Sequence, residues 1–182
     1  MATFVALLRG VNVGDAKRVP MAEQRKLLTG LGYSDVATFL NSGNAVFRAA
    51  SSPARLTATI AGEIAAKMDV EVPVVVKSAG ELSAIVSENP ISAPEADQAR
   101  LLVAFAGDAA ALSTLRPIGS LVVPPERFAL GAHAAYFYCP FGSLKSEAGK
   151  TLLGRAGRAA TTRNWKTVLK LQKLADSIGG PR

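Results

Sequence analysis

Residues 36–48, Val-Ala-Thr-Phe-Leu-Asn-Ser-Gly-Asn-Ala-Val-Phe-Arg, hold two short apolar runs on either side of a polar turn that contains glycine. Runs of this length and composition are typical of strands, and Asn41-Ser-Gly-Asn44 has the residues that a tight hairpin turn needs. The stretch therefore predicts a β-hairpin made of Val36–Leu40 and Ala45–Arg48. This hairpin decides the fold because of the elements expected on each side of it.

A strand and a helix are expected before the hairpin, and a helix and a strand after it. Thr3–Arg9 has the apolar and β-branched composition of a buried strand, and Pro20 opens a helix that runs to about Leu31. Pro53 opens a longer helix, and Val72–Lys77 is a further strand. The residues expected to be buried on the longer helix, spaced by four, are Leu56, Ile60, Ile64 and Met68. The order β-α-β-β-α-β is that of the ferredoxin-like unit.

The same order begins again after a linker-like stretch with two prolines, residues 89–94. The elements expected around and beyond it are a helix over Ser78–Glu88, a strand over Leu101–Ala106, a helix over Ala109–Leu115, strand segments over Ser120–Val123, Phe128–Leu130 and Ala134–Cys139, and a helix over Leu144–Leu153. The sequence therefore predicts an α+β protein with two ferredoxin-like (βαββαβ) halves from a degenerate duplication, over residues 1–88 and 95–182, with a C-terminal helical extension.

Bulk composition indicates a folded chain without a membrane-spanning segment. Of its 182 residues 49% are hydrophobic, enough to bury a sizeable core. Met1 is followed directly by Ala-Thr-Phe-Val with no basic leader, and the apolar runs are too short to cross a bilayer. Cys139 is alone, which excludes an internal disulfide and fits a reducing compartment. We expect a cytoplasmic protein with no membrane partner.

The net charge of +7 is spread unevenly along the chain. Residues 1–77 carry a net +3 and residues 78–140 a net −3, whereas residues 141–182 hold nine Lys/Arg against two Asp/Glu. A basic surplus of this size in one segment favours a polyanionic or phosphorylated partner. A basic, solvated helix face would have the same composition, so both interpretations stay open.

Within this basic segment, residues 161–167 read Thr-Thr-Arg-Asn-Trp-Lys-Thr. A final helix is expected over Arg163–Ile178, with Thr161 or Thr162 as its cap. The free N–H groups and the dipole of a helix start attract anions, and this first turn adds a guanidinium and an ammonium group. The candidate ligand-binding residues in this turn are Thr162, Arg163, Asn164 and Lys166.

A second group of candidates surrounds the loop Gly10–Arg18, between the first strand and the first helix. The loop lacks the glycine spacing of a dinucleotide site, and Gly149-Lys-Thr151 lacks the first glycine of a phosphate loop because Leu144 takes its place. The loop still offers polar side chains around flexible backbone, as a generic anion site does, or it is a plain glycine-rich connection. The candidates are Arg9, Asn12 and Lys17, together with Ser42 and Asn44 in the hairpin turn.

Other side chains give weaker signals. His133 and Cys139, on one continuous strand, would lie about 20 Å apart, too far for proton transfer. Tyr136 and Tyr138 share a face of their strand, where exposed rings would stack on bases, but aromatics at a strand centre more commonly face helices. The carboxylates are scattered and no metal-ligand cluster is present, so neither a metal nor a cofactor is expected.

Three short motifs occur in order: Leu-Leu-Arg-Gly-Val-Asn-Val-Gly at 7–14, Val-Pro-Met at 19–21 leading to Ser-Gly-Asn-Ala-Val-Phe at 42–47, and Thr-Thr-Arg-Asn-Trp at 161–165. Together they resemble the bacterial domain-of-unknown-function family numbered 1697, from Ala6 to about Ala175. The resemblance implies two ferredoxin-like halves and no established activity, so it assigns no catalytic residue. Asn41, where the pattern usually has glutamine, and Asp15-Ala16 depart from it. The residues that match the pattern are Arg9, Gly10, Asn12, Gly14, Pro20, Met21, Ser42, Gly43, Asn44, Thr162, Arg163, Asn164 and Trp165.

Three hypotheses about function follow from these residues. The leading one is a binding module for an anionic ligand, either nucleic acid or a phosphorylated small molecule. The second is an enzyme that acts on a small anionic metabolite in a cleft between the two halves, where amide and guanidinium groups would stabilise negative charge. The third is structural: the motifs fix the packing of the chain, and Arg163 and Asn164 hydrogen-bond its own backbone.

Overall fold

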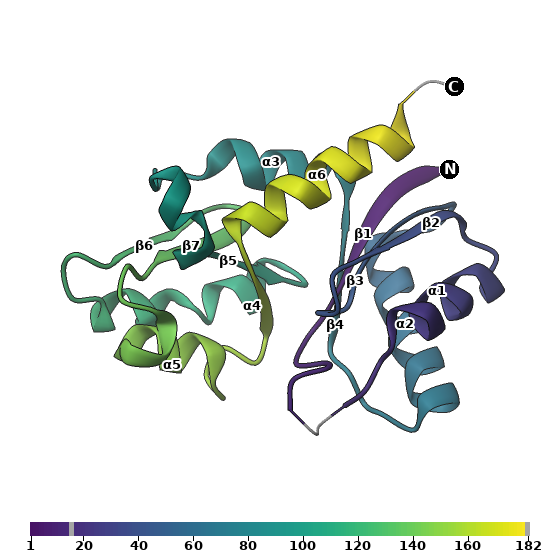
Figure 1. Ribbon diagram of the computed structural model, residues 1–182, viewed down its shortest axis with the longest axis horizontal. Helices are drawn as coiled ribbons and strands as arrows, with labels where there is room; N and C mark the ends of the chain where they lie inside the picture. The colour runs from purple at the N-terminus through teal and green to yellow at the C-terminus, as the bar shows by residue number, and fades with distance from the viewer. Residues whose placement is uncertain (15–16, 181–182) are drawn as a thin grey trace. The chain divides into compact units, whose positions relative to one another are not determined.

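The computed structural model describes residues 1–14 and 17–180 (Figure 1). The chain forms two compact units, each built around one four-stranded antiparallel sheet. The first unit comprises Met1–Leu82 and the chain from Leu171 onward, and the second comprises Ser83–Lys170. The predicted α+β class with two ferredoxin-like halves is confirmed.

The first unit follows the predicted β-α-β-β-α-β order. Its elements are β1 (Ala2–Leu8), α1 (Met21–Gly30), β2 (Ser34–Phe39), β3 (Asn44–Ala49), α2 (Pro53–Met68) and β4 (Val74–Ser78). The sheet order is β2-β3-β1-β4, so β1 and β3 are central and β2 and β4 are the edges. The hairpin expected at residues 36–48 is present as β2 and β3, joined at the Asn41–Asn44 turn.

Helices α1 and α2 lie together on one side of this sheet and form the main core of the unit (Figure 1). The side-chain oxygen of Ser52 accepts a hydrogen bond from the backbone N–H of Arg55, which caps α2 at its N-terminus. The apolar stripe predicted for α2 is confirmed, since its members are buried or, at its last position, partly buried against the core. These are Leu56, Ile60, Ile64 and Met68.

The opposite face of the same sheet is buried as well, and the C-terminal part of α6 (Trp165–Gly179) belongs to this unit. Val5 and Leu7 of β1 and Val46 of β3 are at most 1% exposed. A Cβ atom at Gly179 would lie 3.1 Å from the hydroxyl of Thr3, so the end of α6 passes directly beside β1. The sheet of the first unit is thus covered on both faces.

The second unit repeats the arrangement. After the end of α3 (Ala79–Glu88) come β5 (Leu101–Ala106), α4 (Ala109–Ser113), β6 (Arg127–Leu130), β7 (Ala134–Tyr138), α5 (Glu147–Leu153), β8 (Ala160–Asn164) and the start of α6, with short 3₁₀ helices at Glu95–Arg100, Arg116–Leu121 and Ser143–Lys145. The sheet order β6-β7-β5-β8 is equivalent to that of the first sheet. One face packs against α4 and α5 in a core that includes Leu112, Phe137 and Leu152.

Three sequence-based expectations in this half are wrong. The segment expected as a strand over Ser120–Val123 begins instead in a 3₁₀ helix, with Pro117 in its first turn. The helix expected over Leu144–Leu153 is divided at Ser146, whose hydroxyl caps α5 by accepting from the N–H of Gly149. Residues 160–164, expected to lead into a helix, form strand β8 and complete the second βαββαβ unit.

None of the helices in the described part of the chain is long and apolar enough to cross a membrane. The linker expected at residues 89–94, between halves over residues 1–88 and 95–182, stays a prediction.

Candidate functional site

In the first unit, the loop after β1 and the turn between β2 and β3 are joined through the side chain of Asn12. Its Nδ2 group donates to the carbonyl of Asn41 at 2.7 Å and to the carbonyl of Val19 at 2.8 Å. Its Oδ1 atom accepts from the N–H of Val19 at 2.9 Å. The backbone of Asn12 is left-handed, with φ of 56°, a conformation that asparagine tolerates better than most residues. Both the nitrogen and the oxygen of the Asn12 side-chain amide are therefore hydrogen-bonded to the chain itself.

The turn itself is held just as closely. Asn44 is fully buried, and its Nδ2 group donates to the carbonyl of Phe39 at 2.8 Å and to the hydroxyl of Ser42 at 2.9 Å. Gly43 has φ of +76°, its carbonyl accepts from the N–H of Leu8, and an added Cβ would lie 2.6 Å from the Cβ of Leu8. The Ser-Gly-Asn motif thus fixes a close backbone contact between the turn and β1.

Arg9 and Lys17, the two cationic candidates of this region, differ in their surroundings. The backbone N–H of Arg9 donates to the carbonyl of Pro73, and partial burial lowers the pKa of its guanidinium. Lys17 is exposed and lines a hollow of about 320 Å³ together with residues of α2 and the segment before β4. Asp15-Ala16, the predicted departure from the family pattern, lies outside the described residues.

In the second unit, the stretch 161–167 contains the end of strand β8 and the beginning of α6, and Arg163 belongs to the strand. Arg163 lies on β8 opposite Val103 of β5, which in turn pairs with Tyr136 of β7, so these three side chains share one face of the sheet. Arg163 is 9% exposed, and burial lowers the pKa of its guanidinium to about 10. Its Nη1 donates to the hydroxyl of Thr161 at 3.0 Å and to the carbonyl of Thr162 at 2.8 Å. The prediction that Arg163 lies in the first turn of a helix is therefore wrong.

Asn164 is the residue that starts α6. Its Oδ1 atom accepts from the backbone N–H of Thr167 at 2.9 Å, as an N-cap side chain does, so the cap is Asn164 and not the predicted Thr161 or Thr162. Thr162 is partly exposed on β8, and Lys166 is exposed in the first turn of α6. Of the four candidates in this stretch, Lys166 is the one whose side chain reaches solvent most openly.

Tyr136 and Tyr138 point toward helical segments, as the plainer of the two interpretations predicted. The hydroxyl of Tyr136 donates to the carbonyl of Ile85 at 2.6 Å and lies 2.9 Å from Glu88 Oε1, and burial raises the pKa of Tyr136. The hydroxyl of Tyr138 donates to Asp97 at 2.9 Å. Neither ring is open for base stacking, since both side chains are buried.

Glu88, the last residue of α3, holds the turn between β6 and β7. Its carboxylate accepts three successive backbone N–H groups, those of Ala132, His133 and Ala134, at 2.9–3.1 Å. Burial by itself would raise the pKa of Glu88, but these bonds and the one from Tyr136 outweigh it and lower the pKa below its usual value. The carboxylate is a structural clamp on this turn.

Cys139 does not have the character of a nucleophile. The residue is 2% exposed, its thiol lies 3.2 Å from the carbonyl of Arg100, and burial raises the pKa of the thiol to about 11. His133 is exposed at the turn before β7, and its backbone is bound to Glu88. Within residues 1–14 and 17–180, no three His, Cys, Asp or Glu side chains gather in a way that could hold a metal ion.

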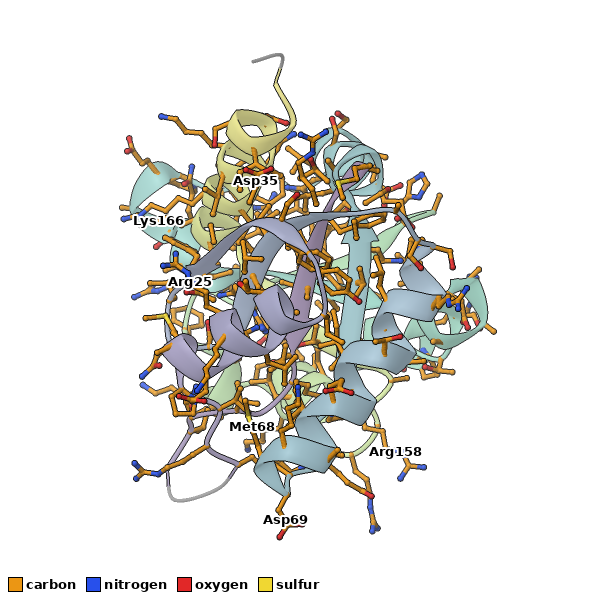
Figure 2. All side chains as sticks on the ribbon, turned by 90° about the vertical axis from the view of Figure 1, so that its right-hand side faces the viewer. Arg25, Asp35, Met68, Asp69, Arg158 and Lys166 are labelled. Atoms are coloured by element: carbon orange, nitrogen blue, oxygen red, sulfur yellow. The ribbon has the colours of Figure 1, made fainter. Side chains whose placement is uncertain are left out.

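A basic hollow in the second unit was missed by the sequence analysis. It measures about 810 Å³ and is lined by Thr114 at the end of α4 and by Arg155, Ala156, Arg158 and Ala159 between α5 and β8. Both arginines are exposed, and Arg158 extends outward in Figure 2. The lining contains two guanidinium groups and no carboxylate. The signal that would have found it is Gly154-Arg-Ala-Gly-Arg158, two arginines three residues apart in a glycine-containing loop.

The backbone of this loop is ordered by its own hydrogen bonds. The N–H of Gly154 donates to the carbonyl of Lys150, and the N–H of Gly157 donates to the carbonyl of Thr151. A Cβ at Gly157 would lie 1.7 Å from the carbonyl oxygen of Leu152, so glycine is required there. The two arginines are thus presented from a fixed turn and not from a free tail.

The fold and these contacts define a class of protein: paired ferredoxin-like α+β units whose motif residues are tied into the chain. The chain belongs to the DUF1697 family, described as a protein of unknown function, whose pattern it matches over residues 1–136. It is similar to the conserved bacterial protein SP0830 from Streptococcus pneumoniae, at 26% identity and a TM-score of 0.77, over 96% of this chain and 98% of that one. No curated protein matches it.

Proposed function

We propose that this protein binds an anionic ligand, a phosphorylated small molecule or nucleic acid, through the hollow that Arg155 and Arg158 line. The observation that carries the proposal is a hollow of about 810 Å³ with two arginines, one threonine hydroxyl and no carboxylate in its lining. Guanidinium groups present paired donors that match the oxygens of phosphate, whereas the hydroxyl of Thr114 already donates to the carbonyl of Ala111. An anion entering this hollow would meet two guanidinium groups and no carboxylate.

The charge distribution supports the same proposal. The segment 141–182, which contains both arginines, has nine Lys/Arg against two Asp/Glu. Such a surplus attracts anions over a distance of about 8–10 Å at physiological salt and increases their local concentration. The hollow therefore lies in the part of the sequence where an anionic ligand is attracted most strongly.

The motif residues have a different role in this proposal from the one that their pattern suggested. Asn12, Asn44 and Arg163 direct side-chain donors at carbonyl and hydroxyl oxygens of the chain itself. These contacts favour the structural hypothesis for the motifs, with ligand binding at the arginine loop. The enzyme hypothesis, which relied on the same amide and guanidinium groups, stays a prediction.

The test is a thermal-shift and binding screen of the full chain against nucleotides, sugar phosphates, polyphosphate and short single-stranded oligonucleotides at low and high salt. A ligand that binds the native state raises its melting temperature, and binding through phosphates weakens as salt rises. The variant Arg155→Ala with Arg158→Ala is expected to lose about tenfold or more in affinity. The control, Arg55→Ala with Lys173→Ala, removes two exposed charges elsewhere and should bind as the original chain does.

Two results would overturn the proposal: no stabilisation by any of these compounds at low salt, or equal affinity of the Arg155/Arg158 variant and the original chain. Affinity that grows with oligonucleotide length assigns the ligand to nucleic acid, whereas affinity that is already complete for a mononucleotide assigns it to a small phosphate compound.

We also place this activity in the cytoplasm, a proposal supported by a buried Cys139 thiol that forms no disulfide, which a reducing compartment preserves.

A further inference from the structure

We propose that the groove between α1 and the edge strand β2 binds an extended, acidic peptide segment of a partner protein. β2 pairs with β3 on one side, and no strand among residues 1–14 and 17–180 pairs with its other side. The open side of an edge strand presents backbone N–H and C=O groups that can add a further strand. The first unit therefore offers a template for an incoming extended chain.

A hollow lies directly at this edge. It measures about 550 Å³ and is lined by Thr38 of β2 and by Met21, Ala22, Arg25, Lys26 and Thr29 of α1. The α1 residues that line it are exposed, and Figure 2 shows Arg25 on the outer side of the α1 ribbon. A strand added to β2 would thus run along a helix face that has apolar, hydroxyl and cationic side chains.

The pairing of β2 with β3 shows which part of the edge is suited to strand addition. The register is regular from Ala37 to Phe39 and shifts between Ser34 and Ala37, at an irregularity where Asp35 has φ of 52°. A bulge bends a strand and interrupts pairing, so an added strand would be confined to the regular end beside Thr38. That end is where the hollow lies.

The side chains of the groove determine the composition of the peptide. Alternate side chains of an added strand point to opposite faces, so one set would face α1. Arg25 and Lys26, the two cations among the α1 residues of the groove, would pair with acidic side chains of that set. No carboxylate lines the hollow, and Asp35 on β2 lies 3.9 Å from the guanidinium of Arg48. The groove therefore favours a peptide with an acidic residue at every second position.

Two other occupants fit the groove less well. A second copy of the chain, paired edge to edge through β2, would bring two sets of Arg25 and Lys26 toward each other, and like charges repel. A nucleic acid would meet the two cations, but the lining holds no aromatic ring on which a base could stack. An acidic strand satisfies the charges and the backbone of β2 at the same time.

The experiment measures binding of a fluorescein-labelled peptide of alternating valine and glutamate to the full chain by anisotropy. We expect saturable binding, with amide NMR shifts confined to β2 and α1. Two control peptides separate charge from strand addition: one has lysine in place of glutamate, and one carries N-methyl groups on its backbone, which keeps the charge and blocks pairing. Both should bind about tenfold or more weakly.

Variants locate the site. Arg25→Glu is expected to weaken the peptide about tenfold, whereas Arg55→Glu, the same change at an exposed position of α2, should leave affinity unchanged. The Arg155→Ala/Arg158→Ala variant should also bind the peptide normally, so failure of this inference and failure of the proposed anion site are distinguishable. Equal affinity for the N-methylated peptide, equal loss in Arg55→Glu, tighter binding of a single-stranded oligonucleotide that shifts the same amides, or self-association through β2 would each overturn it.

Discussion

Arg163 illustrates how one residue can have a different role from the one that its sequence context suggests. A guanidinium next to Asn164 and Lys166 has the composition of an exposed anion site, yet the side chain lies on the buried face of β8. The donors of Arg163 are bound to the hydroxyl of Thr161 and the carbonyl of Thr162. Long charged side chains are rarely buried unless their polar ends are satisfied in this way.

Arg163→Ala is expected to lower the free energy of unfolding by about 1–3 kcal/mol, because one buried and one partly buried oxygen lose a donor and the stem of the side chain leaves a gap. Urea denaturation followed by circular dichroism measures this. The neighbouring substitution Lys166→Ala, at an exposed position, should change stability by no more than about 0.5 kcal/mol. Equal stability of the Arg163→Ala variant and the original chain would show that the buried contacts have no structural importance.

Gly43 is the second residue whose identity the structure explains. Gly43→Ala is expected to cost about 2 kcal/mol or more, because alanine is strained at φ of +76° and its Cβ would lie 2.6 Å from that of Leu8. The matched control is Gly62→Ala on α2, where an added Cβ meets nothing within 4 Å and reduces the backbone freedom of the unfolded chain. That control should gain about 0.5–1 kcal/mol in urea denaturation. Similar effects at the two positions would contradict the close approach of the turn to β1.

Among the elements, the turn between β6 and β7 depends on α3 through one carboxylate. Because the pKa of Glu88 is lower in the folded protein than in the unfolded chain, its ionised form stabilises the fold above the unfolded pKa. That stabilisation is lost as pH falls through the folded pKa. Glu88→Gln removes the negative charge and replaces one acceptor oxygen with an NH₂ group that cannot accept from the three N–H groups. We expect it to lower the free energy of unfolding by about 1–3 kcal/mol at neutral pH.

The measurement for Glu88 is the free energy of unfolding against pH for both chains. The difference between them should be constant near neutrality and should shrink as pH falls below the pKa of an unfolded glutamate and through the lower pKa of folded Glu88. Glu71→Gln, a change at an exposed position before β4, is the control and should follow the original chain throughout. A difference that does not depend on pH would contradict the role of the charge.

Some elements of the fold have a local apolar pattern that predicts them, and others do not. The hairpin, α2 and β5 were predicted because their apolar residues repeat with the period of a strand or helix, and that pattern is local. Strand β8 was missed because Thr161 and Arg163 occupy its buried positions, so a hydrophobicity pattern does not detect it. The run Leu-Val-Val at 121–123 suggested a strand from its β-branched composition, but Pro117 begins a 3₁₀ helix just before it.

The candidate site depended still more on contacts that sequence does not display. The bond from Asn12 to the carbonyl of Asn41 joins residues 29 positions apart, and nothing local predicts it. The sequence pattern singled out this loop and this turn, and their polar side chains were predicted to bind a ligand. In the structure, the side chains of Asn12 and Asn44 hydrogen-bond to the chain itself. The arginine loop at 154–158 has no family motif, and only its position beside Thr114 shows the hollow.

At the scale of the whole molecule, α6 contributes to both units, since Lys170 belongs to the second and Leu171 to the first. The helix is amphipathic: Val168, Leu171 and Ala175 are at most 1% exposed, and Lys166 and Lys173 are exposed. The part of the helix from Leu171 onward thus belongs to the first unit, although it is distant in sequence from β1.

Ala175→Asp is expected to destabilise the first unit by about 3 kcal/mol or more, because it places a charge at a buried position. Amide hydrogen exchange should show lost protection in β1 and β4. Lys173→Asp, a larger change of charge on the exposed side of the same helix, is the control and should leave protection of those strands intact. Unchanged exchange in the Ala175→Asp variant would contradict the packing of α6 in the first unit.

The split of the first unit between the two ends of the chain has a consequence for biosynthesis. Residues 83–170 form the second unit without interruption, so the ribosome delivers everything that this unit needs before Leu171 is translated. Domains generally fold as units during synthesis, from the N-terminus onward. Here the β1–β4 sheet is synthesised before Ser83, but its unit also contains the chain from Leu171 onward, so the whole second unit is translated before the first unit has all of its residues.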